Sequence, residues 1–108
     1  MRSALLLMVL AVSAFACGDA GVDTSAVPDE VLDPILADAA ERTGDDGPTV
    51  VVAEAVEWSD ASFGCPVADV TYAQVITPGY RVVVGAGGET LDYRSDEAGN
   101  FRICEPDA

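Results

Sequence analysis

Cysteines are the residues whose type and spacing carry the clearest chemistry in this chain of 108 residues. There are three of them, Cys17, Cys65 and Cys104. In an exported protein, cysteines form disulfides by default. We therefore expect a disulfide between Cys65 and Cys104, which encloses most of the second half of the chain. The alternative, in which Cys17 pairs with either of the others, leaves an odd thiol.

Equally informative is the chemistry that the chain lacks, because it contains no His and no Lys. It therefore cannot form Ser-His-Asp or Cys-His catalytic sets, and it has no lysine nucleophile. A zinc site would lack its commonest nitrogen ligand. Carboxylates abound, with 19 Asp and Glu residues, but in so acidic a chain any two lie close by chance. We expect no enzyme activity, no metal site and no cofactor.

Two local patterns that suggest ligand sites have simpler explanations. The glycine-rich stretch at residues 85–88 joins two predicted strands and precedes no helix, so it predicts a hairpin turn and not a phosphate loop. Asp92, Asp96, Glu97 and Asn100 lie close in sequence, but their spacing does not match a calcium-binding EF-hand loop. We expect them to form a solvated acidic turn.

The formal net charge is −14. Nucleic-acid binding depends on Lys and Arg neutralising phosphates, so we expect no nucleic-acid partner. Peripheral attachment to anionic lipid by charge is disfavoured for the same reason.

Aromatic residues and the rare arginines are the candidates for recognition. Such residues are enriched at binding sites. The candidate binding surface consists of Trp58, Tyr72, Gln74, Tyr93 and Arg94. In the alternative interpretation Trp58 covers one end of the core beside Cys65, because large apolar side chains are usually buried. The arginines then serve to balance nearby acidic residues.

The N-terminal segment predicts export. Residues 1–16 contain one positive residue followed by a short apolar run, as in a signal peptide, and the run is too short to span a bilayer comfortably. Cys17 follows this run and precedes Gly-Asp-Ala-Gly, which resembles the lipobox of bacterial lipoproteins. Lipidation of Cys17 would anchor the protein to a membrane. Ordinary cleavage after Ala16, which gives a secreted soluble protein, is the alternative.

The mature chain predicts a tether and one domain. Residues 17–27 are small and polar and predict the lipidated Cys and a flexible tether, and residues 28–108 predict a single α+β domain. A helix is expected from the Asp33-Pro34 pair to a C-cap at Gly44. Apolar alternation and turn signals predict strands at 49–58, 71–76, 80–85, 90–94 and 101–104. A Pro-Gly turn is expected at 77–80, and a bulge near Glu54.

The predicted fold is thus an N-terminal helix packed on an antiparallel meander sheet of four to five strands with one disulfide.

A longer pattern supports the export assignment. The stretch Trp-Ser-Asp-Ala-Ser-Phe-Gly-Cys-Pro at 58–66, then Tyr-Ala-Gln at 72–74, Pro-Gly-Tyr at 78–80 and the run to Cys104 resemble a family of small exported bacterial proteins, often lipoproteins. That resemblance also implies the Cys65 to Cys104 pairing, and it implies no known activity. The family commonly has Tyr-Glu-Tyr-His where this chain has residues 91–94, so no His-dependent role is expected here.

We therefore expect an extracytoplasmic, membrane-tethered lipoprotein that acts as a small binding or interaction module, with a protein or a small molecule as its partner. A structural envelope component and an inhibitor of an extracellular enzyme are the alternatives.

Overall fold

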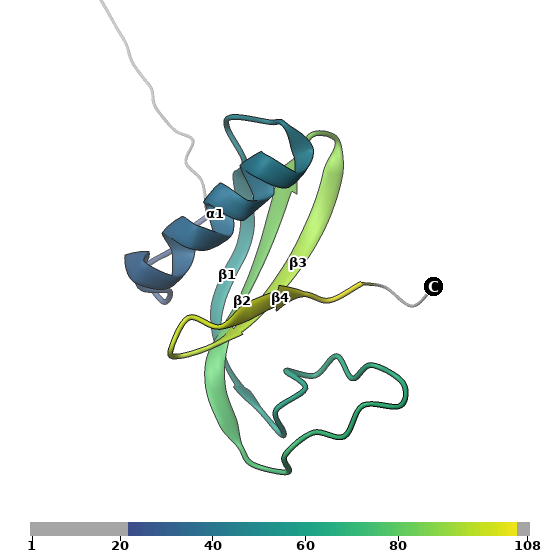
Figure 1. Ribbon diagram of the computed structural model, residues 1–108. Helices are drawn as coiled ribbons and strands as arrows, with labels where there is room; N and C mark the ends of the chain where they lie inside the picture. Colours follow the sequence, from purple (N-terminus) through teal and green to yellow (C-terminus); the bar gives the residue numbers. More distant parts are fainter. Residues whose placement is uncertain (1–21, 106–108) are drawn as a thin grey trace, which may run out of the picture.

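One helical segment followed by several strand segments produces the predicted α+β arrangement. The computed structural model describes residues 22–105, in which one helix packs on a four-stranded sheet (Figure 1). The elements are α1 (Asp29–Thr43), β1 (Thr49–Trp58), β2 (Thr77–Ala86), β3 (Glu89–Asp96) and β4 (Phe101–Ile103). Neighbouring strands are antiparallel and follow the order β1-β2-β3-β4. The predicted meander is confirmed.

The predicted signal peptide, Cys17 and the first part of the predicted tether lie outside the described residues. Val27, which we expected in the tether, is 2% exposed and belongs to the core. The ordered domain therefore includes Val27. Within residues 22–105, no helix combines the length and the apolar character needed to cross a membrane.

Helix α1 begins earlier than predicted. Its N-cap is Pro28, and no side chain caps it, so the expected cap at Asp33 is wrong. Pro34 lies inside the helix, which costs about 3 kcal/mol in a helix interior. The extra first turn buries Val31 and Leu32, each contributing about 1.5–3 kcal/mol. Burial of these two side chains is enough to offset the proline.

The end of α1 agrees with the sequence prediction. Gly44 adopts a left-handed conformation with φ of +78°. Its N–H donates to the Ala40 carbonyl oxygen at 2.8 Å, which satisfies a terminal carbonyl of the helix.

Strand β2 begins where a turn was predicted. Residues 77–80 pair with β1 as far as Thr77 opposite Trp58, whereas residues 71–76, predicted as a strand, form no regular structure. A Cβ atom at Gly79 would overlap the Ser95 carbonyl oxygen and lie 2.8 Å from the Asp96 Cα. Gly79 is therefore required because β3 passes close over it, and the Pro-Gly pair does not mark a turn.

The core lies between α1 and one face of the sheet. It contains Ile35 and Ala39 of the helix and, from the sheet, Val82, Val84 and Tyr93.

A bulge lies between Val50 and Val52, and not near Glu54 as predicted. Because the bulge adds one residue to β1, both Val50 and Ala53 pack toward the core.

The connection between β1 and β2 is long and irregular. We refer to residues 59–76 as the β1–β2 loop. Figure 1 shows it extending from the end of the sheet that lies away from α1. The loop is held by the sheet face that α1 does not cover, and this contact forms the candidate site.

Candidate functional site

A row of charged residues crosses the sheet on the face opposite α1. The strand register pairs Glu54 with Arg81, Arg81 with Arg94, and Arg94 with Arg102. Residues directly opposite each other in an antiparallel pair share a face and lie close together. Three of the chain's five arginines thus occupy adjacent strands. Like charges so placed repel each other, so the row requires nearby anions.

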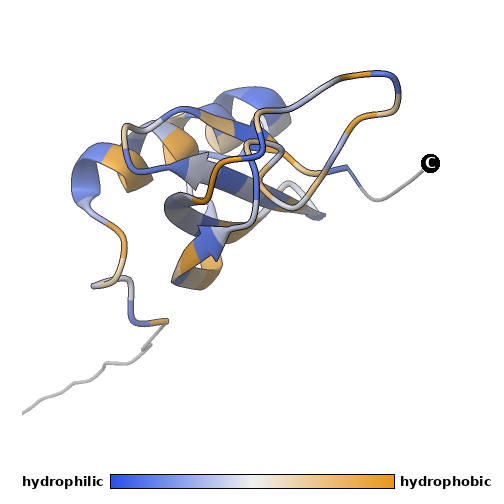
Figure 2. Ribbon diagram, turned by 90° about the horizontal axis from the view of Figure 1, so that it is seen from below, coloured by the Kyte–Doolittle hydropathy of each residue, from blue (hydrophilic) through white to orange (hydrophobic). Residues whose placement is uncertain are grey.

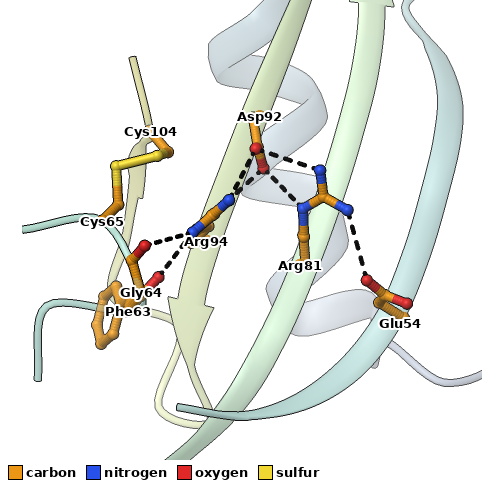
Figure 3. Close-up of polar contacts among 8 residues, drawn as sticks. All are labelled: Glu54, Phe63, Gly64, Cys65, Arg81, Asp92, Arg94 and Cys104. Carbon is orange, nitrogen blue, oxygen red and sulfur yellow. Dashed lines mark hydrogen bonds and ion pairs between the residues drawn. A yellow bond between two sulfur atoms is a disulfide. The ribbon is translucent and has the colours of Figure 1, made fainter. Parts of the chain in front are cut away.

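Asp92 supplies the central anion (Figure 3). Its carboxylate accepts hydrogen bonds from Arg81 at 3.2 and 3.3 Å and from Arg94 at 3.1 and 3.4 Å. Glu54 adds an ion pair to Arg81 at 3.6 Å. Hydrogen bonding to Asp92 raises the pKa of Arg81 above its usual value, although burial opposes the shift. Asp92 and Glu54 thus offset the charges of Arg81 and Arg94.

Arg94 and Arg102 use their remaining donors to hold the β1–β2 loop. Arg94 donates to the carbonyl oxygens of Phe63 at 3.2 Å and Gly64 at 2.9 Å. Arg102 donates to the carbonyl oxygens of Cys65, at 2.8 Å, and of Ser62. Hydrogen bonds with a charged partner contribute roughly 1.5–3 kcal/mol each. Four consecutive backbone carbonyls, at residues 62–65, are therefore bound by two guanidinium groups.

The conformation of the loop at this point is unusual. Phe63 and Gly64 have φ values of +59° and +70°, and a non-glycine residue with positive φ is uncommon. A Cβ atom on Gly64 would lie 3.1 Å from an Arg94 nitrogen and 3.2 Å from the Trp58 ring. The absence of a side chain at Gly64 thus allows the loop to approach Arg94 and Trp58.

Aromatic rings complete the contact between loop and sheet. Trp58 is 7% exposed, and its indole N–H donates to the Ser95 carbonyl oxygen at 2.9 Å. The Arg94 guanidinium lies over this ring, 5.3 Å from its centroid. Arg102 lies 5.7 Å from the centroids of both Phe63 and Tyr72. Such cation–π contacts each contribute about 0.5–2 kcal/mol.

The disulfide between Cys65 and Cys104 adds a covalent link, as predicted. It connects the β1–β2 loop to the residue that follows β4 (Figure 3). The Cys104 N–H also donates to the Asp92 carbonyl oxygen at 2.7 Å. Closure of a chain segment of this size contributes roughly 3–5 kcal/mol through the unfolded state. We call residues 62–65, with these covalent and arginine contacts, the clamped base of the loop.

The five residues of the predicted binding surface do not form one exposed surface. Trp58 and Arg94 lie together, but Trp58 is buried. Tyr72 is half-buried on the loop and Gln74 is exposed there. Tyr93 is 0% exposed and faces α1. Successive strand residues point to opposite faces, so Tyr93 and Arg94 cannot share a surface.

Tyr93 instead joins the sheet to the helix. Its hydroxyl donates to the Asp38 carboxylate at 2.6 Å. Burial and this hydrogen bond raise the pKa of Tyr93 to about 12, and the bond also lowers the pKa of Asp38. Both residues contribute to packing of the domain.

Apart from Tyr72 and Gln74, the exposed part of the loop was not identified from the sequence. We call residues 66–76 the outer arc. Of the six large aliphatic side chains that are exposed in the described part of the chain, four lie here, with exposures from 51% to 62%: Val67, Val70, Val75 and Ile76. The predicted strand at 71–76 hid this signal for Val75 and Ile76, because a strand directs alternate side chains toward a core. Val67 and Val70 lie before that predicted strand. Figure 2 shows the loop standing out from the sheet with hydrophobic segments along it.

Internal hydrogen bonds support the outer arc, among them one from the Val70 N–H to the Val67 carbonyl oxygen at 3.2 Å. The Ala61 N–H donates to the Ala73 carbonyl oxygen at 3.0 Å, and the Val67 N–H donates to the Tyr72 hydroxyl at 3.1 Å. The Tyr72 ring in turn lies against Arg102. The arc therefore has a defined shape while its aliphatic side chains face solvent.

Other surface features offer less. A hollow of about 730 Å³ beside β3 is lined by Arg81, Asp92, Arg94 and Cys104 among others, but its central arginines are already paired with Asp92. Among residues 22–105, no group of three or more acidic, His or Cys residues is placed to bind a metal ion.

Comparison with known proteins gives one match, which is to a family model. No curated protein and no solved structure matches the chain. The model of a domain of unknown function, DUF8738, matches residues 32–104. This span begins in α1 and ends at the second cysteine of the disulfide, so it includes the sheet and the clamped base. The chain therefore belongs to the DUF8738 family of domains of unknown function.

Proposed function

We propose that this protein is an extracytoplasmic, membrane-tethered binding module that contacts a partner protein through the outer arc. The observation that carries this proposal is the contrast within one loop. The base is fixed by a disulfide and by two arginines, whereas the outer arc exposes four aliphatic side chains. Exposed apolar residues gathered on one feature typically mark an interaction site.

Fixation of the base favours binding. A loop that is ordered before it meets its partner loses less conformational entropy on association. The two left-handed residues, Phe63 and Gly64, fix the direction in which the chain leaves the base. The same properties suit a loop that enters the cleft of an extracellular enzyme, so an inhibitor is one form of this proposal.

Charge favours a protein over a membrane surface as the occupant. The net charge of −14 repels anionic lipid headgroups. Asp69 lies within the outer arc and is exposed. A complementary partner would have an apolar hollow for the valines and the isoleucine, with basic residues around it.

Tethering is supported by the sequence alone. The lipobox-like position of Cys17 and the small polar residues after it would hold the domain near a membrane with freedom to meet partners.

The test is site-specific photo-crosslinking in the native cell envelope. A photoreactive residue at Val70 is expected to give a discrete protein adduct. The same residue at Glu41, which is exposed on α1, serves as the control position and should give none. The partner identified from the adduct is then purified for binding measurements.

Val70→Ser with Ile76→Ser should weaken binding of that purified partner at least tenfold. Val51→Ser is the matched control, because Val51 is 50% exposed but lies on β1. Equal affinities of the two variants would sink the proposal, as would capture of the protein by lipid vesicles in place of a protein partner.

A further inference from the structure

Strand β1 is a ten-residue edge strand. In an antiparallel ladder alternate residues direct their backbone N–H and C=O groups to the neighbouring strand, and the others direct them outward. In residues 22–105, no backbone hydrogen bond joins β1 to a segment other than β2. Its outer edge therefore presents donors and acceptors that another strand can use.

One hydrogen bond on the far side of the sheet fixes which groups point outward. Cys104 N–H donates to the Asp92 carbonyl, so Asp92 faces away from β2. The next residue, Tyr93, must then face β2 and pair there with Val82. Val82 thus faces away from β1, and its partner Ala53 faces away from β2.

Because alternate residues of a strand share an orientation, the backbone N–H and C=O groups of Ala55 and Glu57 also point away from β2. The side chains of Ala53 and Ala55 are small, and Ala55 and Glu57 are exposed. Natural edge strands are often blocked by bulges, prolines or bulky charged residues. The bulge of β1 lies between Val50 and Val52, before this segment. The second half of the edge has no bulge and no proline, and its charged residues are the acids Glu54 and Glu57, so it is accessible to an incoming strand that carries positive charge.

A second observation indicates the chemistry of the incoming strand. A hollow of about 350 Å³ adjoins the same positions and is lined by Ala55, Glu57, Pro78, Tyr80 and Glu97 among others, with no Arg in the lining. Neither Glu57 nor Glu97 has an ion-pair partner among the described residues. The apolar stem of a Lys or Arg can lie on the tyrosine and proline while its charge meets the two carboxylates.

We propose that the β1 edge binds an extended, cationic segment of a partner protein by strand addition. The segment pairs with the outward backbone groups of Ala53, Ala55 and Glu57 and places a Lys or Arg in the hollow between Glu57 and Glu97. A second copy of this chain is the wrong occupant, because each copy carries a net charge of −14. This site is separate from the outer arc.

The experiment uses the full mature protein and a short synthetic peptide of alternating lysine and valine. In the bound peptide the lysine side chains would enter the hollow on the α1 side of the sheet. The valine side chains would pack beside Val52 and Val56 on the other face. Saturation with peptide should slow amide hydrogen exchange at Ala53, Ala55 and Glu57 at least tenfold. Protection at other positions only, or no binding, overturns the proposal.

Two peptides with N-methyl groups separate backbone pairing from simple charge attraction. One peptide is methylated at the backbone amide nitrogens of its lysines and the other at the backbone amide nitrogens of its valines. The lysine side chains are unchanged in both, so the two peptides carry equal charge. In a strand pair only one of these sets faces β1. One peptide should lose binding while the other stays within about twofold of the unmodified peptide, because a set that faces solvent makes no ladder hydrogen bond. Equal effects of the two modifications refute strand addition.

Charge variants test the hollow. Glu57→Gln and Glu97→Gln should each weaken the peptide about two- to fivefold, as partly exposed ion pairs do. Glu30→Gln, on α1, changes the net charge by the same amount as either variant and should leave affinity unchanged. Val70→Ser with Ile76→Ser should also leave it unchanged, so failure here is distinguishable from failure of the outer-arc proposal. Self-association in sedimentation that competes with the peptide would identify a second copy as the occupant and overturn the proposal.

Discussion

Arg81 on β2 and Arg94 on β3 are direct partners in the sheet, yet their guanidinium groups bind the same carboxylate, that of Asp92. Removal of this one acid would leave two cations side by side, and Arg94 would keep only its contacts to the loop carbonyl oxygens and the Trp58 ring.

We predict that Asp92→Asn lowers the free energy of unfolding by about 1–3 kcal/mol, because charged hydrogen bonds are lost and like charges are left adjacent. Urea unfolding measures the change. Asp33→Asn, at an exposed position of α1, is the matched control and should change stability by less than about 0.5 kcal/mol. Similar effects of the two changes would show that Asp92 is not central.

Gly79→Ala should lower the free energy of unfolding by about 3 kcal/mol or prevent folding. The new methyl group would overlap the backbone of Ser95, and overpacking of this kind costs about 1–3 kcal/mol or more. Gly47→Ala provides the comparison, because no atom lies within 4 Å of a Cβ there. Circular dichroism during thermal unfolding distinguishes them, and a well-folded, stable Gly79→Ala protein would contradict the close approach of β3.

Tyr93 should make stability depend on alkaline pH. Its pKa rises from 10 in the unfolded chain to about 12 in the folded protein. A raised folded-state pKa gives stability that is fully present below pH 10 and is lost as pH rises toward 12. Tyr93→Phe should remove this component, whereas Tyr80→Phe should keep it. Unfolding midpoints measured between pH 9 and 12, an interval that spans both values, provide the check, and an unchanged alkaline slope in Tyr93→Phe would disprove it.

Asp38 gives the complementary acid dependence. The Tyr93 hydrogen bond lowers its folded-state pKa below the ordinary value of 3.8. Its contribution is therefore present above pH 3.8 and is lost as pH falls through the lower folded value. Asp38→Asn should make the acid side of the stability profile shallower, and Asp33→Asn should not.

The disulfide should stabilise the loop more than the sheet. Cys65→Ser with Cys104→Ser is expected to cost roughly 3–5 kcal/mol of unfolding free energy. At subdenaturing urea concentrations, amide exchange should accelerate in residues 62–76 before it does in β2 and β3. Uniform acceleration across the domain would argue against a local clamp.

Cys17 should carry the lipid if the tethering proposal is correct. An alkyne-bearing fatty acid should label the protein in cells, and Cys17→Ser should abolish the label. The Cys65→Ser, Cys104→Ser protein should retain it. Label that survives Cys17→Ser would refute lipidation at this residue.

The fold followed from local patterns where each pattern had one physical meaning. The bounds of β1, Thr49–Trp58, were predicted correctly because a turn signal directly precedes a Val-rich segment there. Pro34 and the pair Pro78-Gly79 led to a wrong helix start and a wrong turn, because each is compatible with two local structures. A proline can begin a helix or be tolerated inside one by burial of its neighbours, and a glycine can form a turn or admit a passing strand.

The candidate site was harder to predict, because it depends on register. No local feature of the sequence states that Arg81, Arg94 and Arg102 are aligned, since their alignment depends on how the strands pair. The opposite orientations of Tyr93 and Arg94 could have been predicted, because both lie in the predicted strand at 90–94, where alternation places neighbours on opposite faces. The assignment of both to one binding surface was therefore wrong. The exposure of Val75 and Ile76 could not be inferred once residues 71–76 were assigned to a strand.

The contacts of the clamped base leave most side chains of the outer arc free to vary. Arg94 and Arg102 bind backbone carbonyl oxygens at residues 62–65, and every amino acid carries such an oxygen. Apart from Tyr72, whose hydroxyl and ring support the loop, the scaffold therefore places few chemical demands on the side chains of residues 66–76. New specificities can arise there by substitution without loss of the anchorage, as in a display scaffold whose framework is constant and whose presented segment diversifies.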